Sequence, residues 1–133
     1  EVMLGVRPSQ ALSVNVISFG YKNGLPMDLD LLFDVRFLPN PYYDDRLASR
    51  TGLDREVIRY VLHEPYAKLF VVRLVDFIDF LLPHFQREGK SYLSIGIGCT
   101  GGRHRSVVIA NMLYHHLRLQ TRAVRIFHRD IQK

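Results

Sequence analysis

The chain has 133 residues, of which 47% are hydrophobic and 23% are charged. This length and apolar content fit one folded domain and exclude a disordered tail. The formal net charge of +5 at pH 7 favours an anionic partner, such as nucleic acid or a phosphorylated metabolite. The single cysteine, Cys99, excludes an internal disulfide framework and favours a reducing compartment, so we expect a cytoplasmic protein. No apolar run is long enough to span a bilayer, so we expect no membrane partner.

The first elements follow an amino-terminal segment without clear periodicity. Residues 1–12 are interpreted as a linker or edge segment, and residues 13–133 as the domain. The chain begins at Glu1 rather than at a methionine, which indicates a fragment or a processed chain. Alternation from Ser13 to Phe19 predicts a strand that Gly20 closes.

A second strand is predicted over Leu31–Leu38, with Asp34 and Arg36 on one face. An aspartate and an arginine on one face can bind a polyol and a phosphate, or they can pair with each other, and the sequence leaves both readings open. Asp54 has the character of a helix N-cap, which predicts a short helix ending near Glu64.

A long helix is predicted from Pro65 to Glu88, with Gly89 ending it. It is apolar nearly all round, because its polar stripe holds only Arg73, Asp76 and Asp79. So wide an apolar surface predicts either a central helix or a subunit interface.

The last elements are a strand over Ser91–Gly98, a helix over His104–Leu119 and a strand over Thr121–Phe127. Strands that alternate with helices predict an α/β fold with a mostly parallel sheet. We expect a single three-layer domain.

The loop between the third strand and the last helix carries the strongest functional signal. Its glycines allow the backbone N–H groups to point inward, and the helix that follows adds a positively polarised end. Arginine, histidine and hydroxyl side chains supply further donors. The candidate phosphate-binding residues of this loop are Cys99, Thr100, Gly101, Gly102, Arg103, His104, Arg105 and Ser106.

The spacing of Cys99 and Arg105 permits an enzymatic alternative. Cys-x5-Arg followed by serine is the pattern of cysteine-dependent phosphatases, in which the cysteine is a thiolate nucleophile. The residue before the cysteine is Gly98, whereas that signature has a histidine, and no general-acid aspartate is evident. We therefore predict no catalytic residue and no enzymatic activity. The histidines show no metal pattern, so neither a metal nor a cofactor is expected.

Four segments in this order resemble one family over about Ser13 to Arg129. They are Ser18-Phe19-Gly20-Tyr21-Lys22-Asn23-Gly24-Leu25-Pro26, Phe33-Asp34-Val35-Arg36-Phe37-Leu38-Pro39-Asn40-Pro41, Thr51-Gly52-Leu53-Asp54 and Ile97-Gly98-Cys99-Thr100-Gly101-Gly102-Arg103-His104-Arg105-Ser106. Together they resemble the C-terminal domain of the RapZ/YvcJ family of bacterial nucleotide-binding and RNase adapter proteins.

The resemblance implies a fold similar to part of a phosphofructokinase. It also implies regulation instead of catalysis, with small RNA, a ribonuclease and glucosamine-6-phosphate as partners in the enterobacterial branch. Family members bind ATP or GTP through an N-terminal domain that is absent here, and they assemble as homo-oligomers through domains of this kind.

By matching motif, the resemblance assigns the sugar-phosphate contacts to residues of the loop and the second strand, with Ser13 as an additional candidate. These contacts are Asp34, Arg36, Cys99, Thr100, Gly101, Gly102, His104 and Arg105. Tyr42 stands where the enterobacterial branch has a histidine, and the chain lacks that branch's dense basic tail. Separately, the basic residues predict an RNA-binding surface that includes Lys22, Arg103, Arg125 and Arg129.

Overall fold

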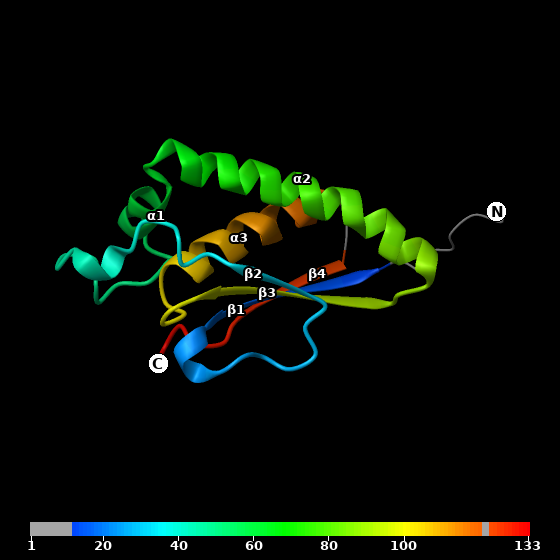
Figure 1. Ribbon diagram of the computed structural model, residues 1–133, viewed down its shortest axis with the longest axis horizontal. Helices are drawn as coiled ribbons and strands as arrows, with labels where there is room; N and C mark the ends of the chain where they lie inside the picture. Colours follow the sequence, from blue (N-terminus) through cyan, green and yellow to red (C-terminus); the bar gives the residue numbers. More distant parts are fainter. Residues whose placement is uncertain (1–11, 121–122) are drawn as a thin grey trace.

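The computed structural model describes residues 12–120 and 123–133, so the predicted linker lies almost wholly outside the described residues. The described strands form one four-stranded sheet of order β2-β3-β1-β4, in which each neighbouring pair is parallel (Figure 1). This arrangement confirms the α/β prediction. The strands are β1 (Ser13–Gly20), β2 (Leu31–Asp34), β3 (Tyr92–Cys99) and β4 (Ala123–His128).

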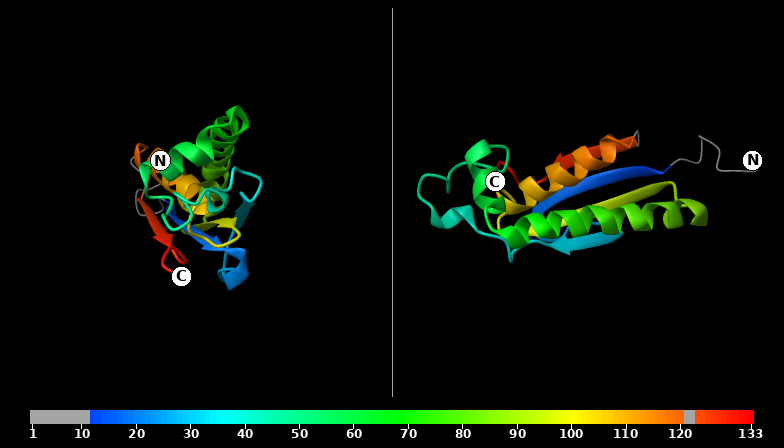
Figure 2. Two further views of the ribbon diagram at one scale, coloured as in Figure 1. Left: turned by 90° about the vertical axis from the view of Figure 1, so that its left-hand side faces the viewer. Right: turned by 90° about the horizontal axis from the view of Figure 1, so that it is seen from above.

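The α-helices lie on one face of the sheet, and a connection without an α-helix lies under the other face (Figures 1 and 2). The segment after β1 starts with a short 3-10 helix, η2 (Tyr21–Asn23), and crosses beneath the sheet on its way to β2. Helices, sheet and this connection make up the three layers. The helices are α1 (Arg55–Leu62), α2 (Pro65–Glu88) and α3 (Arg105–Arg118).

The hydrophobic core fills the space between the sheet and the helices. Alternate residues of β1 and β3 point into it because side chains alternate across a strand. From above, α3 contributes a nearly continuous buried run, which explains why its sequence is apolar on most sides. Fully buried side chains at this interface are Val14, Val16, Leu93, Ile95, Ile97, Ile109, Leu113 and Leu117.

The opposite face of β3 is shaped by two glycines, Gly96 and Gly98. A Cβ added to Gly98 would lie 2.6 Å from Cζ of Phe19, and one added to Gly96 would lie 2.6 Å from Cδ1 of Leu29. The rings of Phe19 and Tyr21 meet edge to face there, with centroids 5.0 Å apart. The space beside these glycines is therefore filled by the chain's own side chains.

The predicted second strand was too long. The strand β2 ends at Asp34 instead of Leu38, because the Leu38 N–H donates to the Val35 carbonyl (3.2 Å) and closes a turn. The N–H of Val35 still donates to the Gly98 carbonyl (2.9 Å), so the turn stays attached to the end of β3. Asp34 is consequently the last residue of the strand and Arg36 lies on the turn, so the two do not share one face of a strand.

The helix boundaries agree with the sequence signals. The carboxylate of Asp54 accepts the Glu56 N–H (2.9 Å), which confirms the predicted N-cap of α1. Gly89 ends α2 in the left-handed conformation, with φ of 99°. No helix of the described residues is both long and apolar enough to cross a membrane.

Of the two alternatives predicted for α2, a central helix or a subunit interface, the structure excludes the central helix. Only one stripe of α2 is buried, against α3 and the sheet, because the helix lies in the outer layer (Figure 2). His116 of α3 and Asp79 of α2 hold the two helices together with Nε2 and Oδ2 2.8 Å apart. The buried residues of α2 are Ala67, Leu74, Ile78 and Leu82.

Candidate anion-binding site

The loop between β3 and α3 lies at the carboxyl edge of the parallel sheet, where α/β domains bind ligands (Figure 2). The helix α3 begins at Arg105, and its N-cap residue, His104, makes no side-chain capping bond. The first N–H groups of a helix have no partner within the helix and carry partial positive charge. This end of α3 is thus electrostatically suited to an anion.

Glycines hold the loop between two neighbouring backbones. Gly102 has φ of 82° and crosses the end of β1 so closely that a Cβ on Gly20 would lie 2.7 Å from the Gly102 nitrogen. From the other side, the Gly52 N–H donates to the Arg103 carbonyl (2.8 Å). A Cβ on Gly52 would lie 2.5 Å from the His104 carbonyl oxygen. Both contacts are with backbone, so a larger residue at Gly20 or Gly52 would displace the loop.

Asp130, which no sequence pattern singled out, ties the carboxyl-terminal segment to this crossing. Its side chain is fully buried and accepts the Gly20 N–H (2.7 Å), the Arg129 guanidinium (2.8 Å) and the Lys133 ammonium (3.0 Å). Burial by itself raises the pKa of Asp130, but these hydrogen bonds outweigh it and hold the pKa well below the usual range. Asp130 is therefore ionised and joins the carboxyl-terminal segment to the end of β1.

Cys99 lies behind the loop. The Gly102 N–H donates to its sulfur (3.3 Å), and the thiol donates to the Ser106 hydroxyl (3.1 Å). The side chain is 2% exposed and does not line the pocket described below. In this arrangement Cys99 fixes the loop to the first turn of α3.

Arg105 supports the loop from inside. Its side chain is 5% exposed, and Nη1 donates to the carbonyls of Arg36 (2.6 Å) and Leu38 (3.3 Å). Nη2 donates to the Thr100 hydroxyl (3.4 Å). Arg105 thus joins the turn after β2 to the loop after β3.

Arg103 makes a second bridge. Its Nε donates to the Ile131 carbonyl (3.3 Å), and one of its terminal nitrogens donates to the Ser49 carbonyl (3.1 Å). The residue also lines the pocket, so it connects the pocket wall to two distant segments.

Asp34 and Arg36 pair with each other at 2.6 Å. The hydrogen bonds from Arg36 lower the pKa of Asp34, against the smaller effect of burial. The Arg36 guanidinium lies 4.0 Å from the centroid of the Tyr21 ring. The pair stands beside the loop through the contact between Arg105 and the Arg36 carbonyl, but neither residue lines the pocket.

A pocket of about 400 Å³ opens in front of the loop. This volume suits a small metabolite. His104 lines it although the residue is only 8% exposed, and its Nε2 has no hydrogen-bond partner among the described residues. Burial lowers the pKa of His104 and outweighs hydrogen bonds to the backbone of Arg50 and Ala48, which raise it, so the ring is neutral at pH 7. The lining residues are Lys22, Asn40, Tyr42, Tyr43, Ala48, Thr100, Gly101, Arg103, His104 and Lys133.

Four of these lining residues, Asn40, Tyr43, Ala48 and Lys133, were not predicted. Asn40 caps a second 3-10 helix, η3 (Pro41–Tyr43), by accepting the Tyr42 N–H (3.1 Å). Its position before a proline was a local signal for this turn. Ala48 and Lys133 had no local signal, because folding alone brings their segments to the pocket.

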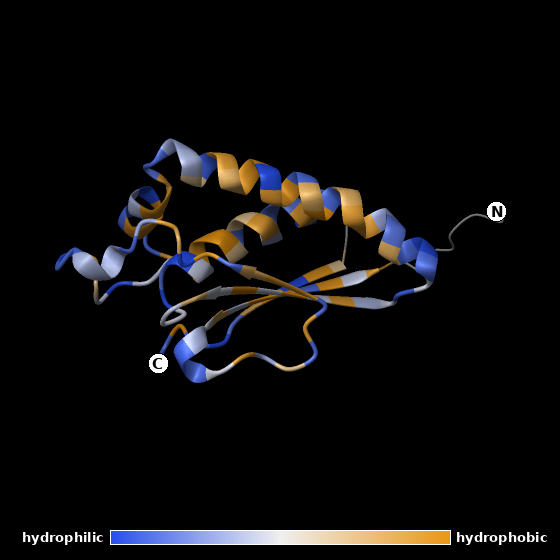
Figure 3. Ribbon diagram, in the orientation of Figure 1, coloured by the Kyte–Doolittle hydropathy of each residue, from blue (hydrophilic) through white to orange (hydrophobic). Residues whose placement is uncertain are grey.

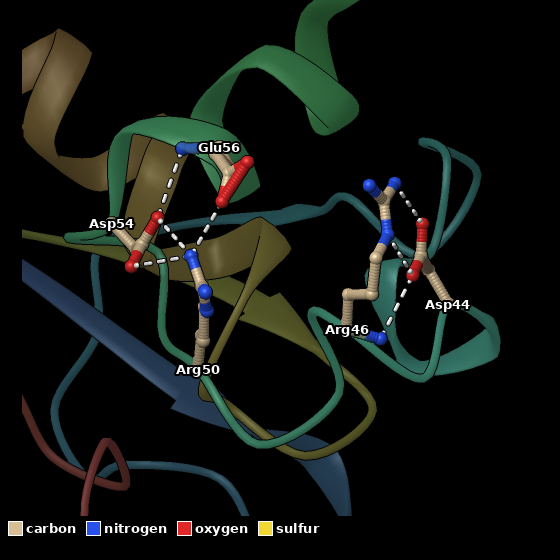
Figure 4. A network of polar contacts seen from close by, with 5 residues as sticks. All are labelled: Asp44, Arg46, Arg50, Asp54 and Glu56. Carbon is tan, nitrogen blue, oxygen red and sulfur yellow. Dashed lines mark hydrogen bonds and ion pairs between the residues drawn. The ribbon is translucent and has the colours of Figure 1, made fainter.

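Ion pairs on the surface hold the segment that carries Ala48 and Ser49 (Figure 4). Arg50 lies between Asp54 (3.4 Å) and Glu56 (2.6 Å), and Arg46 pairs with Asp44 at 3.2 Å. Exposed pairs of this kind contribute little each, about 0–1 kcal/mol.

Of the four residues predicted to bind RNA, Arg125 lies apart from the other three. Lys22 and Arg103 line the pocket. Arg125 instead pairs in register with Asn15, which lies about 17 Å along β1 from Gly20, at roughly 3.3 Å per residue. Arg129 donates to the Gly24 carbonyl (2.6 Å) and to Asp130, and thus serves the carboxyl-terminal segment.

The fold and the pocket define a class: a parallel α/β domain with a positively polarised loop between a central strand and a helix. The family model of the RapZ C-terminal domain matches residues 12–132, and the chain belongs to this family. A nucleotide-binding protein of Bacillus cytotoxicus is 52% identical over 131 residues, which are 98% of this chain and 44% of that protein. Nucleotide-binding proteins of Bacillus thuringiensis and Bacillus mycoides are 51% identical over the same shares. The chain spans less than half the length of these curated relatives.

Among residues 12–120 and 123–133, no group of three histidine, cysteine, aspartate or glutamate side chains is arranged to hold a metal ion.

Proposed function

We propose that this chain is a regulatory domain that binds a phosphorylated small molecule, namely a sugar phosphate such as glucosamine-6-phosphate, and acts through partners instead of catalysing a reaction. The single observation that carries the proposal is the pocket at the amino end of α3, with the unpartnered Nε2 of buried His104 in its wall. Buried polar atoms are normally hydrogen-bonded, so an unpaired one beside a pocket favours a ligand.

The phosphate is proposed to lie against Thr100 and Gly101, at the positive end of α3. Lys22 lines the pocket and adds a positive charge, and Lys133, whose ammonium pairs with Asp130, lies at the rim. Tyr42 and Tyr43, which are 65% and 80% exposed, then offer their faces to the sugar ring. In this arrangement Arg105 and Cys99 position the loop without direct contact with the phosphate.

Calorimetry with glucosamine-6-phosphate, inorganic phosphate and glucosamine tests this proposal. We expect both phosphate-bearing compounds to bind and glucosamine not to bind. Lys22→Gln should weaken binding about tenfold through loss of one charge-assisted contact. Arg55→Gln, at an exposed position on α1, should leave binding unchanged. The proposal fails if no phosphate compound produces heat or a thermal shift.

The phosphatase alternative is tested separately. The nearly complete burial of the Cys99 thiol and its absence from the pocket lining favour a regulatory role. We expect no turnover of p-nitrophenyl phosphate. A turnover that disappears in Cys99→Ser would instead establish a cysteine-dependent phosphatase.

RNA and a protein partner such as a ribonuclease remain proposed partners. Lys22 at the pocket rim favours an RNA contact there, and that contact would compete with the sugar phosphate. A gel shift whose affinity falls steeply with salt, and falls further with saturating glucosamine-6-phosphate, would support this competition. We also propose that the nucleotide binding named for the relatives belongs to their remaining length, because the Gly-x4-Gly-Lys-[Ser/Thr] motif does not occur in this chain.

A further inference from the structure

A second hollow, of about 390 Å³, lies beside α1 and shares no lining residue with the pocket in front of the loop. The helix α1 carries both hydrophilic and hydrophobic residues (Figure 3). Four of the lining residues recur along α1 at intervals of three and four, so they form one face of this helix. The lining residues of this hollow, which we call the α1 hollow, are Arg46, Leu47, Glu56, Arg59, Tyr60 and His63.

The floor of the α1 hollow is apolar and aromatic. Leu47 is buried, and the half-buried ring of Tyr60 meets the ring of His63 edge to face, with centroids 5.5 Å apart. The His63 ring is held in place, because its Nδ1 lies 2.6 Å from the Tyr60 carbonyl oxygen. A floor of this kind suits an aromatic or aliphatic side chain of a partner.

Two guanidinium groups at the edge of the α1 hollow are available to a partner. Arg59 is exposed, and its side chain forms no hydrogen bond or ion pair with any residue of 12–120 or 123–133. Arg46 is 80% exposed and contacts only Asp44 (3.2 Å) among the same residues. The carboxylate of Glu56 is already paired with Arg50 at 2.6 Å (Figure 4). The hollow therefore combines an apolar floor with unneutralised positive charge.

We propose that the α1 hollow binds an acidic segment of a protein partner. An aromatic or leucine side chain of that segment lies over Leu47 and Tyr60, and flanking carboxylates pair with Arg46 and Arg59. A guanidinium group binds a carboxylate through two parallel hydrogen bonds, which gives such a contact both charge and direction. This inference rests on the part of the proposed function that gives the domain a protein partner.

The same hollow is less suited to RNA. The carboxylates of Asp44 and Glu56 lie beside the arginines (Figure 4), and they would repel a continuous chain of phosphates. Separate carboxylates of a peptide can reach the two arginines without passing these groups.

The position of the α1 hollow connects it to the candidate anion-binding site. Leu47 lines the hollow, and the next residue, Ala48, lines the pocket in front of the loop. The following carbonyl, of Ser49, accepts a hydrogen bond from Arg103 of that pocket (3.1 Å). A partner in the hollow would therefore contact the same turn that borders the sugar phosphate.

Selection of random twelve-residue peptides displayed on phage, with the immobilised chain as target, tests this inference. We expect the selected peptides to share two or more carboxylates that flank a phenylalanine, tryptophan or leucine. In fluorescence polarisation, Arg46→Glu and Arg59→Glu should each weaken binding of such a peptide at least about tenfold, because each introduces repulsion between carboxylates. Arg73→Glu makes the same charge change on the exposed side of α2 and should leave binding unchanged.

Exchange of the charges gives the sharpest readout. The double variant R46E/R59E should bind the selected peptide after its carboxylates are replaced by lysine, and should bind it more tightly than wild type does. Circular dichroism and the melting temperature check that the variants fold. If Arg59→Glu lowers the melting temperature, Arg59→Gln removes the charge without reversing it and should still weaken peptide binding, by about threefold or more.

The inference is overturned if no acidic peptide is selected, or if the selected peptides bind R46E/R59E as tightly as wild type. Binding of single-stranded RNA that R46E/R59E abolishes would also overturn it and would assign the two arginines to RNA. Calorimetry with glucosamine-6-phosphate separates this inference from the proposed ligand, because neither arginine lines that pocket and R46E/R59E should bind the sugar phosphate like wild type. A wild-type chain that binds acidic peptides but no sugar phosphate would contradict only the proposed ligand.

Discussion

The two long helices have similar apolar content but different surroundings. In α3, eight residues are buried, among them Arg105 and Ser106, because the helix lies directly on the sheet and its first turn borders the loop. In α2, four residues are buried and the opposite side faces outward. Apolar sequence is thus used for two purposes here: α3 builds the core and presents the candidate site, while α2 covers the core and offers a surface.

The largest expected effect is a difference in the free energy of unfolding between a variant of α3 and a variant of α2. Ile109→Ala removes a fully buried side chain of α3 and should lower the free energy of unfolding by about 4 kcal/mol, through lost burial and the cavity that remains. Val72→Ala on the outer side of α2 should change it by less than about 0.5 kcal/mol at concentrations where the chain is monomeric. Urea unfolding of both variants measures the difference. Equal losses would mean that the exposed side of α2 is covered.

The next effect concerns the support of the loop before α3. Asp130→Ala leaves Arg129 without its buried partner and frees the Gly20 N–H, so we expect a loss of about 3 kcal/mol. Asp76→Ala, which removes an exposed carboxylate of α2, serves as the control and should be nearly neutral. A loss below about 1 kcal/mol for Asp130→Ala would show that the carboxyl-terminal segment is not needed to hold the loop.

A smaller effect is expected at the end of α2. Gly89 has φ of 99°, and a Cβ there would meet no atom within 4 Å, so only backbone strain opposes Gly89→Ala. We expect a loss of about 1 kcal/mol. Gly101→Ala is the control, since its φ is not positive and its Cβ would lie 4.0 Å from Lys22. Thermal unfolding of the two variants distinguishes the backbone strain at Gly89 from the general effect of replacing a glycine by alanine.

The smallest effect is a pH dependence centred on α3. His128 lies between Ser18 (2.6 Å) and Asn111 of α3 (3.1 Å), and burial lowers its pKa. The unfolded chain therefore takes up a proton first as the pH falls below about 6.5, so stability is full above that value and decreases below it. Burial acts in the same direction on the pKa of His104.

His128→Gln should make the decrease in stability between pH 7 and pH 5 shallower, whatever its effect at pH 7. Urea unfolding at several pH values gives the slope. An unchanged slope would mean that His128 does not titrate in this range. Carboxylates with a lowered pKa, such as Asp34, change the stability only below about pH 4, where protonation removes the stability that their ionised form contributes to the folded state.

Several elements followed from local sequence alone. Alternation located β1 and β3, the Asp54 cap located α1, and Gly89 ended α2, because each signal acts over a few residues. The second strand was predicted too long, because the alternation of the sequence continues past Asp34. The turn that ends the strand depends on the hydrogen bond from the Leu38 N–H to the Val35 carbonyl. The apolar character of α2 predicted burial, but its place beside α3, with one side buried and the other exposed, depends on the packing of the whole helical layer on the sheet.

By itself, the sequence determined the α/β class, the order of elements and the loop at the end of β3, because periodicity and glycine placement are local properties. Only the tertiary structure decided which side chains reach the pocket. It turned Arg105 and Cys99 inward as supports, and it brought Tyr43 and Lys133 to the rim. The physical reason is that a pocket forms where distant segments meet, and each donor in it is directed by partners far away in the chain.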